Sequence, residues 1–97
     1  MAETKKKEDN TVFIGSKPFM NYVRAVEIQF NQNNKEVLIR SRGKFISRAV
    51  DVEQVIKHGP LGASIETKRI STNSEEFQNQ EGKKVKVSTI EIALVKK

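Results

Sequence analysis

Basic side chains gather at two glycine-containing turns, where they could bind an anion. The first turn is Gly15-Ser16-Lys17-Pro18 and the second is Arg42-Gly43-Lys44. A stretch with helical spacing of apolar residues follows each turn, so each cation lies beside the unpaired N–H groups that open a helix. The helix dipole favours phosphate there. One such glycine often gives only steric relief, but two turns with an excess of cations favour phosphate binding.

A second group of cations surrounds Gly82, and residues 35–48 carry five basic side chains against one acid, Glu36. Charge runs of this kind are also typical of a solvated surface, so each cluster alone leaves both interpretations open. Together they define the candidate phosphate contacts: Lys17, Arg42, Lys44, Lys83, Lys84 and Lys86. The secondary candidates are Ser16, whose hydroxyl could instead cap the first helix, and Tyr22, Arg40 and Arg48.

The sequence lacks the residues of a catalytic or metal site. His58 is the only histidine, and its place at a predicted helix end favours capping or simple exposure. Asp51 and Glu53 are two residues apart on a predicted helix, so they do not share a face. No Walker-type or GxGxxG pattern occurs, cysteine is absent, and the carboxylates show no clustered spacing. We therefore expect no enzyme, no catalytic residue, no metal and no cofactor.

The position of the cations also bears on how a nucleic acid would be recognised. Reading bases in the major groove requires a helix or ribbon that presents Arg, Asn and Gln to the base edges. Cations at turns and at a hairpin tip suit phosphates and a minor groove better. Tyr22 could stack on an exposed base, but its place beside an apolar stripe favours partial packing on the core.

Length and composition limit the class of protein. The chain has 97 residues, enough for one domain, and 18 basic against 12 acidic side chains give it a net charge of +6. That balance favours a polyanionic partner, nucleic acid before membrane. The hydrophobic share of 36% indicates a thin core that a partner subunit could complete. No apolar run is long enough for a membrane span or signal peptide, so we expect a soluble, intracellular protein.

Apolar spacing predicts the elements that position these residues. Residues 1–10 read as a disordered tail, and residues 11–97 as a single domain. Short apolar runs predict strands at 11–14 and 37–39. Helical spacing predicts one helix that Pro18 opens and a second helix over 44–58, ended by Gly59-Pro60; the stripe of the first is Phe19, Val23, Val26 and Phe30.

The last third predicts a hairpin whose base packs on the core and whose tip projects outward. A strand over 65–72 pairs with one over 85–95, and the polar loop over 73–84 reads as a mobile arm. The last strand is apolar at odd positions first and at even positions later, as Val85, Val87, Ile90, Ile92 and Leu94 show. It either contains a bulge near Ser88-Thr89 or changes which side is buried.

The element order is therefore β-α-β-α-β-β, an α+β two-layer sandwich with a long C-terminal hairpin arm. A helix between two short apolar strands implies a right-handed parallel crossover. In parallel strands both strand-to-helix turns lie at the same edge of the sheet. The two basic turns are thus expected side by side.

Three motifs, in this order, resemble the Alba family of small archaeal chromatin proteins. The resemblance runs from about Val12 to Lys97. The motifs are Ile14-Gly15-Ser16-Lys17-Pro18 with Met20-Asn21-Tyr22-Val23, then Arg42-Gly43-Lys44-Phe45-Ile46-Ser47-Arg48-Ala49-Val50-Asp51, then Val87-Ser88-Thr89-Ile90-Glu91-Ile92.

This resemblance implies a fold similar to the C-terminal domain of bacterial translation initiation factor 3, in a homodimer. It implies binding to double-stranded DNA with little sequence preference, DNA compaction, RNA binding, and a cytoplasmic, chromosome-associated location. It implies neither a membrane nor a small-molecule partner. The body of the dimer would contact phosphates through Lys17, Arg42 and Lys44, and the two arms would follow the minor groove with Lys83, Lys84 and Lys86.

The sequence departs from the family at two places. Ser16 occupies the first position of a usual lysine pair, the one at which the family carries regulatory acetylation. The segment 58–63 lacks the aromatic that many members use for contacts between dimers along DNA, and Leu61 is a weaker substitute. The resemblance therefore supports binding more firmly than cooperative coating or bridging. An alternative is an RNA-binding component of a ribosomal or RNA-processing particle.

Overall fold

The structure, a computed structural model, describes residues 10–97, and most of the predicted tail, residues 1–9, lies outside this range. The helices and strands follow the predicted order β-α-β-α-β-β, with two short 3₁₀ turns (η1 and η2) inserted. In chain order they are β1 (Thr11–Phe13), α2 (Phe19–Asn31), β2 (Glu36–Arg42), η1 (Gly43–Phe45), α3 (Ile46–His58), η2 (Gly62–Ser64), β3 (Ile65–Gln78) and β4 (Lys84–Lys96).

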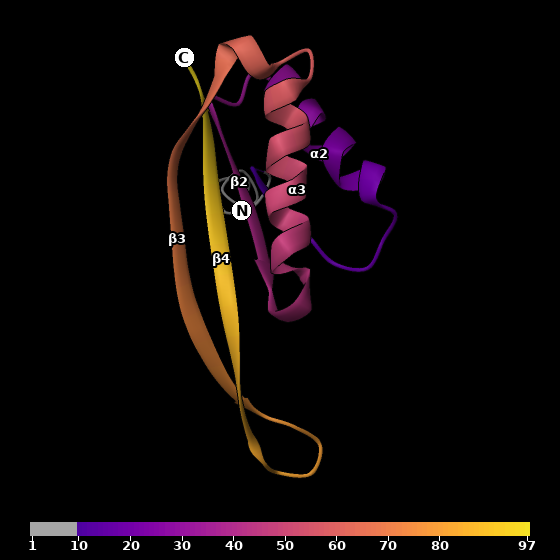
Figure 1. The fold of residues 1–97 in the computed structure, drawn as a ribbon, viewed down its shortest axis with the longest axis vertical. Coiled ribbons are helices and arrows are strands. Elements are labelled where there is room, and N and C mark those ends of the chain that lie inside the picture. The colour runs from indigo at the N-terminus through magenta and orange to yellow at the C-terminus, as the bar shows by residue number, and fades with distance from the viewer. Residues whose placement is uncertain (1–9) are drawn as a thin grey trace, which may run out of the picture.

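The strands form one mixed sheet in the order β1-β2-β4-β3. The β1–β2 pair is parallel, and β4 runs antiparallel to both β2 and β3. Both helices cover one face of this sheet, and the β3–β4 hairpin extends well beyond them (Figure 1). Within the described chain no helix covers the other face, which we call the open face. The predicted α+β class and parallel crossover are confirmed.

The core fills the space between the helices and the covered sheet face. The predicted helical stripes are buried, at Val23, Val26 and Phe30 in α2 and at Ala49, Val52 and Ile56 in α3. The sheet supplies alternate residues to the same core. Burying each large apolar side chain contributes about 1.5–3 kcal/mol, so this packing holds the two layers together. The sheet's contribution is Val12, Val37, Ile39, Ile65, Ile90, Ile92 and Leu94.

Both helices begin slightly later than the sequence predicts. Pro18 is the residue before α2 rather than part of its first turn. The predicted start of the second helix at Lys44 lies instead in η1, and α3 begins at Ile46. Gly43 has a φ of +61°, a left-handed conformation that a side chain disfavours. The chain therefore turns tightly after β2 before the regular helix can start.

The predicted mobile loop over 73–84 is wrong in extent. Cross-strand pairs continue out to Gln78–Lys84, so the turn comprises only residues 79–83. The side-chain Oδ1 of Asn79 accepts hydrogen bonds from the N–H groups of Glu81 and Lys83 at 2.9 and 3.0 Å. Backbone pairing does not require apolar side chains, so a polar sequence can form this ribbon. We call residues 74–88 the arm, because β2 ends at the pair Arg42–Thr89 and only the hairpin continues beyond it.

The apolar residues of β4 change from odd to even positions because the buried side of the strand changes, the second of the two predicted alternatives. Its pairing with β3 is unbroken from Ile90 to Lys84, so a bulge near Ser88-Thr89 is wrong. Val85 and Val87 simply face the open side, whereas Ile90 faces the helices. The irregularity lies in β3, between Thr67 and Arg69. Its extra residue places Ile65 and Ile70 on the same face of the sheet, although an odd number of positions separates them.

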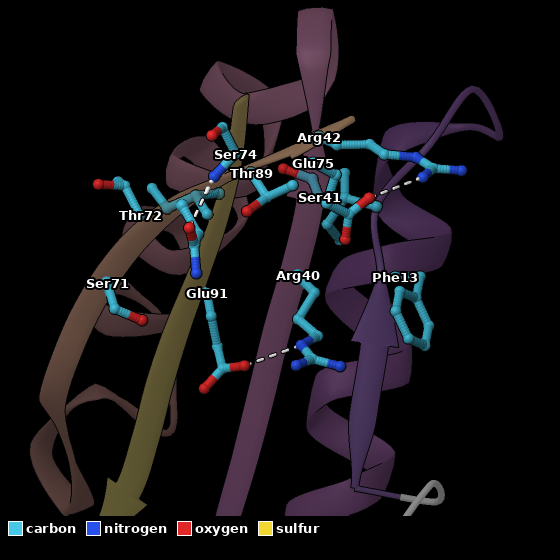
Figure 2. Close-up of a pocket in the computed structure, with 13 residues that line it drawn as sticks. Phe13, Arg40, Ser41, Arg42, Ser71, Thr72, Ser74, Glu75, Thr89 and Glu91 are labelled. Carbon is cyan, nitrogen blue, oxygen red and sulfur yellow. Dashed lines mark hydrogen bonds and ion pairs between the residues drawn. The ribbon is translucent and has the colours of Figure 1, made fainter. Parts of the chain in front are cut away.

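A carboxylate on the open face links three strands. Glu91 of β4 accepts from Arg40 Nε of β2 at 2.8 Å and from Arg69 Nη2 of β3 at 3.0 Å. Figure 2 shows Arg40 reaching Glu91 across the sheet. Burial alone would raise the pKa of Glu91, but hydrogen bonds from Arg69 and Arg40, with their charges, outweigh it and hold the pKa below its ordinary value. The ionised form therefore stabilises the sheet.

Replacing this carboxylate should make stability less dependent on pH. Glu91→Gln should cost about 1 kcal/mol at neutral pH. The folded pKa lies below the unfolded value of about 4.3, so the contribution is complete above that value and is lost as the pH falls through the folded pKa. Urea unfolding across acidic to neutral pH measures this. Glu66→Gln, at an exposed residue of β3 on the same open face of the sheet, is the control. An equal loss in both variants would contradict the prediction.

Candidate nucleic-acid interface

The two basic turns lie at one end of the molecule, as the sequence predicts. Because β1 and β2 are parallel, the chain leaves both strands at the same edge and enters α2 and α3 from there. Lys17 and Lys44 are exposed in these turns. A cleft lies at this end beside Lys44. The same edge adjoins the root of the arm (Figure 1). The cleft is lined by Ser16, Phe19, Lys44, Phe45, Ser47, Arg48 and Asp51.

Neither helix start is occupied by a capping side chain. Pro18 precedes α2 and Phe45 precedes α3, and neither makes a side-chain cap hydrogen bond. The first turn of each helix also contains no acidic residue. The capping role considered for Ser16 is therefore wrong; Ser16 is exposed and lines the cleft. The positive end of each helix dipole is therefore not covered by an acidic or capping side chain, although the N–H groups of Ile46 in α3 and Asn21 in α2 already donate to the carbonyl oxygens of Gly43 and Pro18.

Arg48 fixes the turn that carries Lys17. From α3, its Nη1 donates to the carbonyl oxygens of Gly15 at 2.8 Å and Lys17 at 2.5 Å. Its guanidinium lies 5.9 Å from the ring centroids of both Phe19 and Tyr22. Arg48, a secondary candidate for phosphate binding, thus has partners within the protein. No sequence pattern indicates this role, because the two residues that Arg48 contacts lie more than 30 positions away along the chain.

Tyr22 belongs to the core rather than to an exposed surface. Its side chain is only 8% exposed, and its hydroxyl accepts a hydrogen bond from the Lys17 N–H at 2.9 Å. Base stacking by Tyr22 is therefore wrong, and the packing alternative is confirmed. The hydroxyl instead supports the same turn that Arg48 holds.

The arm carries its cations on two parts of its surface. Lys84 and Lys86 alternate with the open-face residues and lie on the same side of β4 as Ile90, the side that the helices cover in the body. Lys83 is in the turn. The arm also holds Glu75, Glu76 and Glu81, so its three lysines are balanced by three acids.

Arg42 does not lie with Lys17 and Lys44, so the predicted grouping of these three residues is wrong. It is the last residue of β2 and points to the open face, where its Nη1 lies 3.1 Å from Glu75 Oε1 (Figure 2). Alternation along β2 places Arg40 on that face as well, paired with Glu91. The structure therefore brings together the lysines of the two turns and separates the arginines of β2 from them.

The remaining polar side chains that could take part in catalysis or metal binding do not form such a site within residues 10–97. His58 Nδ1 lies 2.8 Å from the Gln54 carbonyl oxygen at the end of α3, which confirms the capping interpretation. The Oγ of Ser41 is buried without a hydrogen-bond partner. Within residues 10–97, no three His, Cys, Asp or Glu side chains are grouped as metal ligands. Over the same residues, no helix has the length and apolarity to cross a bilayer.

Comparison with known proteins identifies the family. The Alba sequence model matches residues 10–74. "DNA/RNA-binding protein Alba" of Methanocella arvoryzae is 49% identical over 87 residues, 90% of each chain, and its namesake in Methanococcus maripaludis is 46% identical, covering 91% of this chain and 99% of the relative.

Two solved structures share the fold. Alba from Thermoplasma volcanium superposes with a TM-score of 0.83 at 41% identity, over 90% of this chain and all of the other. ALBA1 from Trypanosoma brucei gives 0.72 at 25% identity, over 91% of this chain and 69% of the other. By sequence, motif order and fold, this chain belongs to the Alba family.

Proposed function

We propose that this protein binds double-stranded DNA with little sequence preference, and also RNA, as a homodimer that compacts DNA in a cytoplasmic, chromosome-associated role. The relatives named DNA/RNA-binding proteins support nucleic acid as the partner. One observation carries the rest. The uncapped starts of α2 and α3, with exposed Lys17 and Lys44, lie at the same end as an arm whose Lys84 and Lys86 are on the helix side.

In this proposal the helix starts bind the phosphate backbone. Each start offers the positive end of a helix dipole and a nearby lysine. Lys44 is steadied by the Phe45 ring, whose centroid lies 5.5 Å from its Nζ. Such contacts fix where the protein sits but carry no sequence information. Contacts made to phosphate alone would account for the proposed low sequence preference.

The arm would extend the contact along the minor groove. It continues past β2 for five residues of β3, about 17 Å at the rise of a strand, before its turn begins. Lys83, Lys84 and Lys86 are its candidate contacts. Because the arm has no net charge, only the orientation of these lysines would favour the duplex.

A partner subunit would cover an apolar patch along α3 and β3. Val50 and Ile70 are 37% and 54% exposed, although both are large and apolar. Between them in sequence, Glu53 is buried and accepts a hydrogen bond from the Thr67 hydroxyl at 2.5 Å. An apolar surface beside a satisfied buried carboxylate suits a dimer interface that includes the second helix and part of the sheet. Leu61, after α3, is the residue available for contacts between dimers.

The main alternative is a component of an RNA-containing particle. It is worth testing because the name of the relatives includes RNA as well as DNA. Affinities for duplex DNA, structured RNA and single strands at one fixed salt concentration would separate the two functions. Chromatin binding requires tight binding to duplex DNA of any sequence. Preference for structured RNA by a large factor would support the alternative.

Removing a lysine from a helix start should weaken binding to all duplexes by a similar factor. Lys17→Ala should also lower the log–log salt slope by about 0.9 per subunit, or about 1.8 for a dimer. Lys57→Ala removes the same charge from the far end of α3 and is the matched control. Titrations over a salt series measure both effects. Equal slopes for the two variants would show that Lys17 does not bind phosphate.

Shortening the arm should shorten the protected site on DNA. Deleting residues 75–78 and 84–87 keeps the turn and the alternation of faces, and it removes two glutamates and two lysines, so net charge is unchanged. The arm loses about 13 Å, equivalent to about four base pairs for each subunit. Nuclease footprinting measures the site. An unchanged footprint would contradict the minor-groove role.

The dimer should depend on the patch on α3 and β3. Sedimentation at micromolar protein should show twice the 11.0 kDa mass of one chain. Ile70→Glu should shift this species toward the monomer, because it places a charge in the interface. Ile28→Glu, at a residue equally exposed on α2 (52% against 54%), should not. A parent protein that sediments only as a monomer would refute the homodimer.

A further inference from the structure

We infer that Glu75 competes with nucleic-acid phosphate for Arg42, so that the ion pair holds the arm root in the free protein and gives way when a duplex binds. This inference rests on the proposed function and adds to it Arg42, on the open face, as a further phosphate contact. Its basis is the 3.1 Å approach of Arg42 Nη1 to Glu75 Oε1. The guanidinium that would bind the phosphate is thus already occupied by an anion of the same chain.

The ion pair lies at the junction of body and arm. Arg42 ends β2 opposite Thr89, and Glu75 pairs with Val87 one step further out. Because β4 lies between β2 and β3, the two side chains meet across it on the open face (Figure 2). Among the ion pairs of residues 10–97, this one alone joins the arm to the body.

Exposure makes this pair exchangeable. The side chains of Arg42 and Glu75 are 66% and 56% exposed, so a phosphate can approach without uncovering either. Carboxylate and phosphate bind the guanidinium through the same N–H groups, so one replaces the other directly. Arg40 provides the contrast within the same strand. Its partner Glu91 is 20% exposed and is also bound by Arg69, so Arg40 stays with the sheet.

The exchange would couple phosphate binding to arm position. When Arg42 binds a phosphate, Glu75 loses its link to β2, and the arm beyond Thr89 is held only by its own hairpin. The released carboxylate then lies close to the bound phosphate, and its repulsion lowers affinity. Glu75 therefore limits how tightly the protein binds.

Removing the carboxylate should raise affinity only while Arg42 is present. Glu75→Gln should tighten duplex binding about twofold to fivefold per subunit at low salt, the range expected for an exposed ion pair. Glu66→Gln makes the same charge change on the same strand and face, at the other end of the sheet, and should have a smaller effect. In an Arg42→Ala background, Glu75→Gln should no longer tighten binding.

Each outcome of this cycle is decisive. An equal gain from Glu75→Gln with and without Arg42 would mean that Glu75 merely repels DNA, and the exchange would be overturned. Arg42→Ala with unchanged affinity would overturn it too, and would remove Arg42 from the proposed body contacts. Continued weakening by Lys17→Ala would in that case show that the function itself stands.

A direct observation of the exchange comes from nuclear magnetic resonance of the full chain. In ¹³C-labelled protein, a saturating random-sequence duplex should move the side-chain carboxyl signal of Glu75 toward its position in free Arg42→Ala. The Glu91 carboxyl signal, whose pair is retained, should move much less. A Glu75 signal that stays at its free-protein position under saturation would overturn the inference.

Discussion

The uninterrupted alternation of the two faces along strand β4 is the constraint on which the rest of the molecule depends. Its inner half pairs with β2 and β3 and supplies Ile90, Ile92 and Leu94 to the core. Its outer half pairs with β3 alone. Because no residue is inserted between the halves, the alternation that buries Ile90 also determines that Lys84 and Lys86 lie on the helix side. Core packing therefore sets the orientation of the arm's cations.

The end of the molecule that holds the helix starts is prepared before any ligand arrives. The parallel crossover brings the two turns together, and Arg48 and Tyr22 hold the first of them through its backbone. A lysine on a fixed turn loses less conformational freedom on binding than one on a loose loop. These contacts use backbone atoms of the turn and leave the Lys17 side chain exposed.

Much of this architecture follows from the sequence, because apolar spacing reports burial. It predicted both helices, the order of the elements along the chain and the shared edge of the basic turns. It did not predict that residues 73–78 continue a strand, since polar side chains carry no periodic signal when only the backbone pairs. It also missed the face on which Arg42 lies, because that depends on where β2 ends and on its register with β4. The role of Arg48 in holding the first turn was missed for a related reason. Its partners are backbone carbonyl oxygens, which every residue carries, so no residue type in the sequence marks them.

The charge balance of the arm has a kinetic consequence. Long-range attraction to a polyanion acts on net charge, and within the part of the chain described the arm contributes none: three lysines face three glutamates. At physiological ionic strength such opposed charges cancel beyond about 8 Å. In the proposed complex the body of the protein would then govern the rate of encounter with DNA, and the arm would act only after contact. Its lysines would lengthen the lifetime of the complex rather than speed its formation.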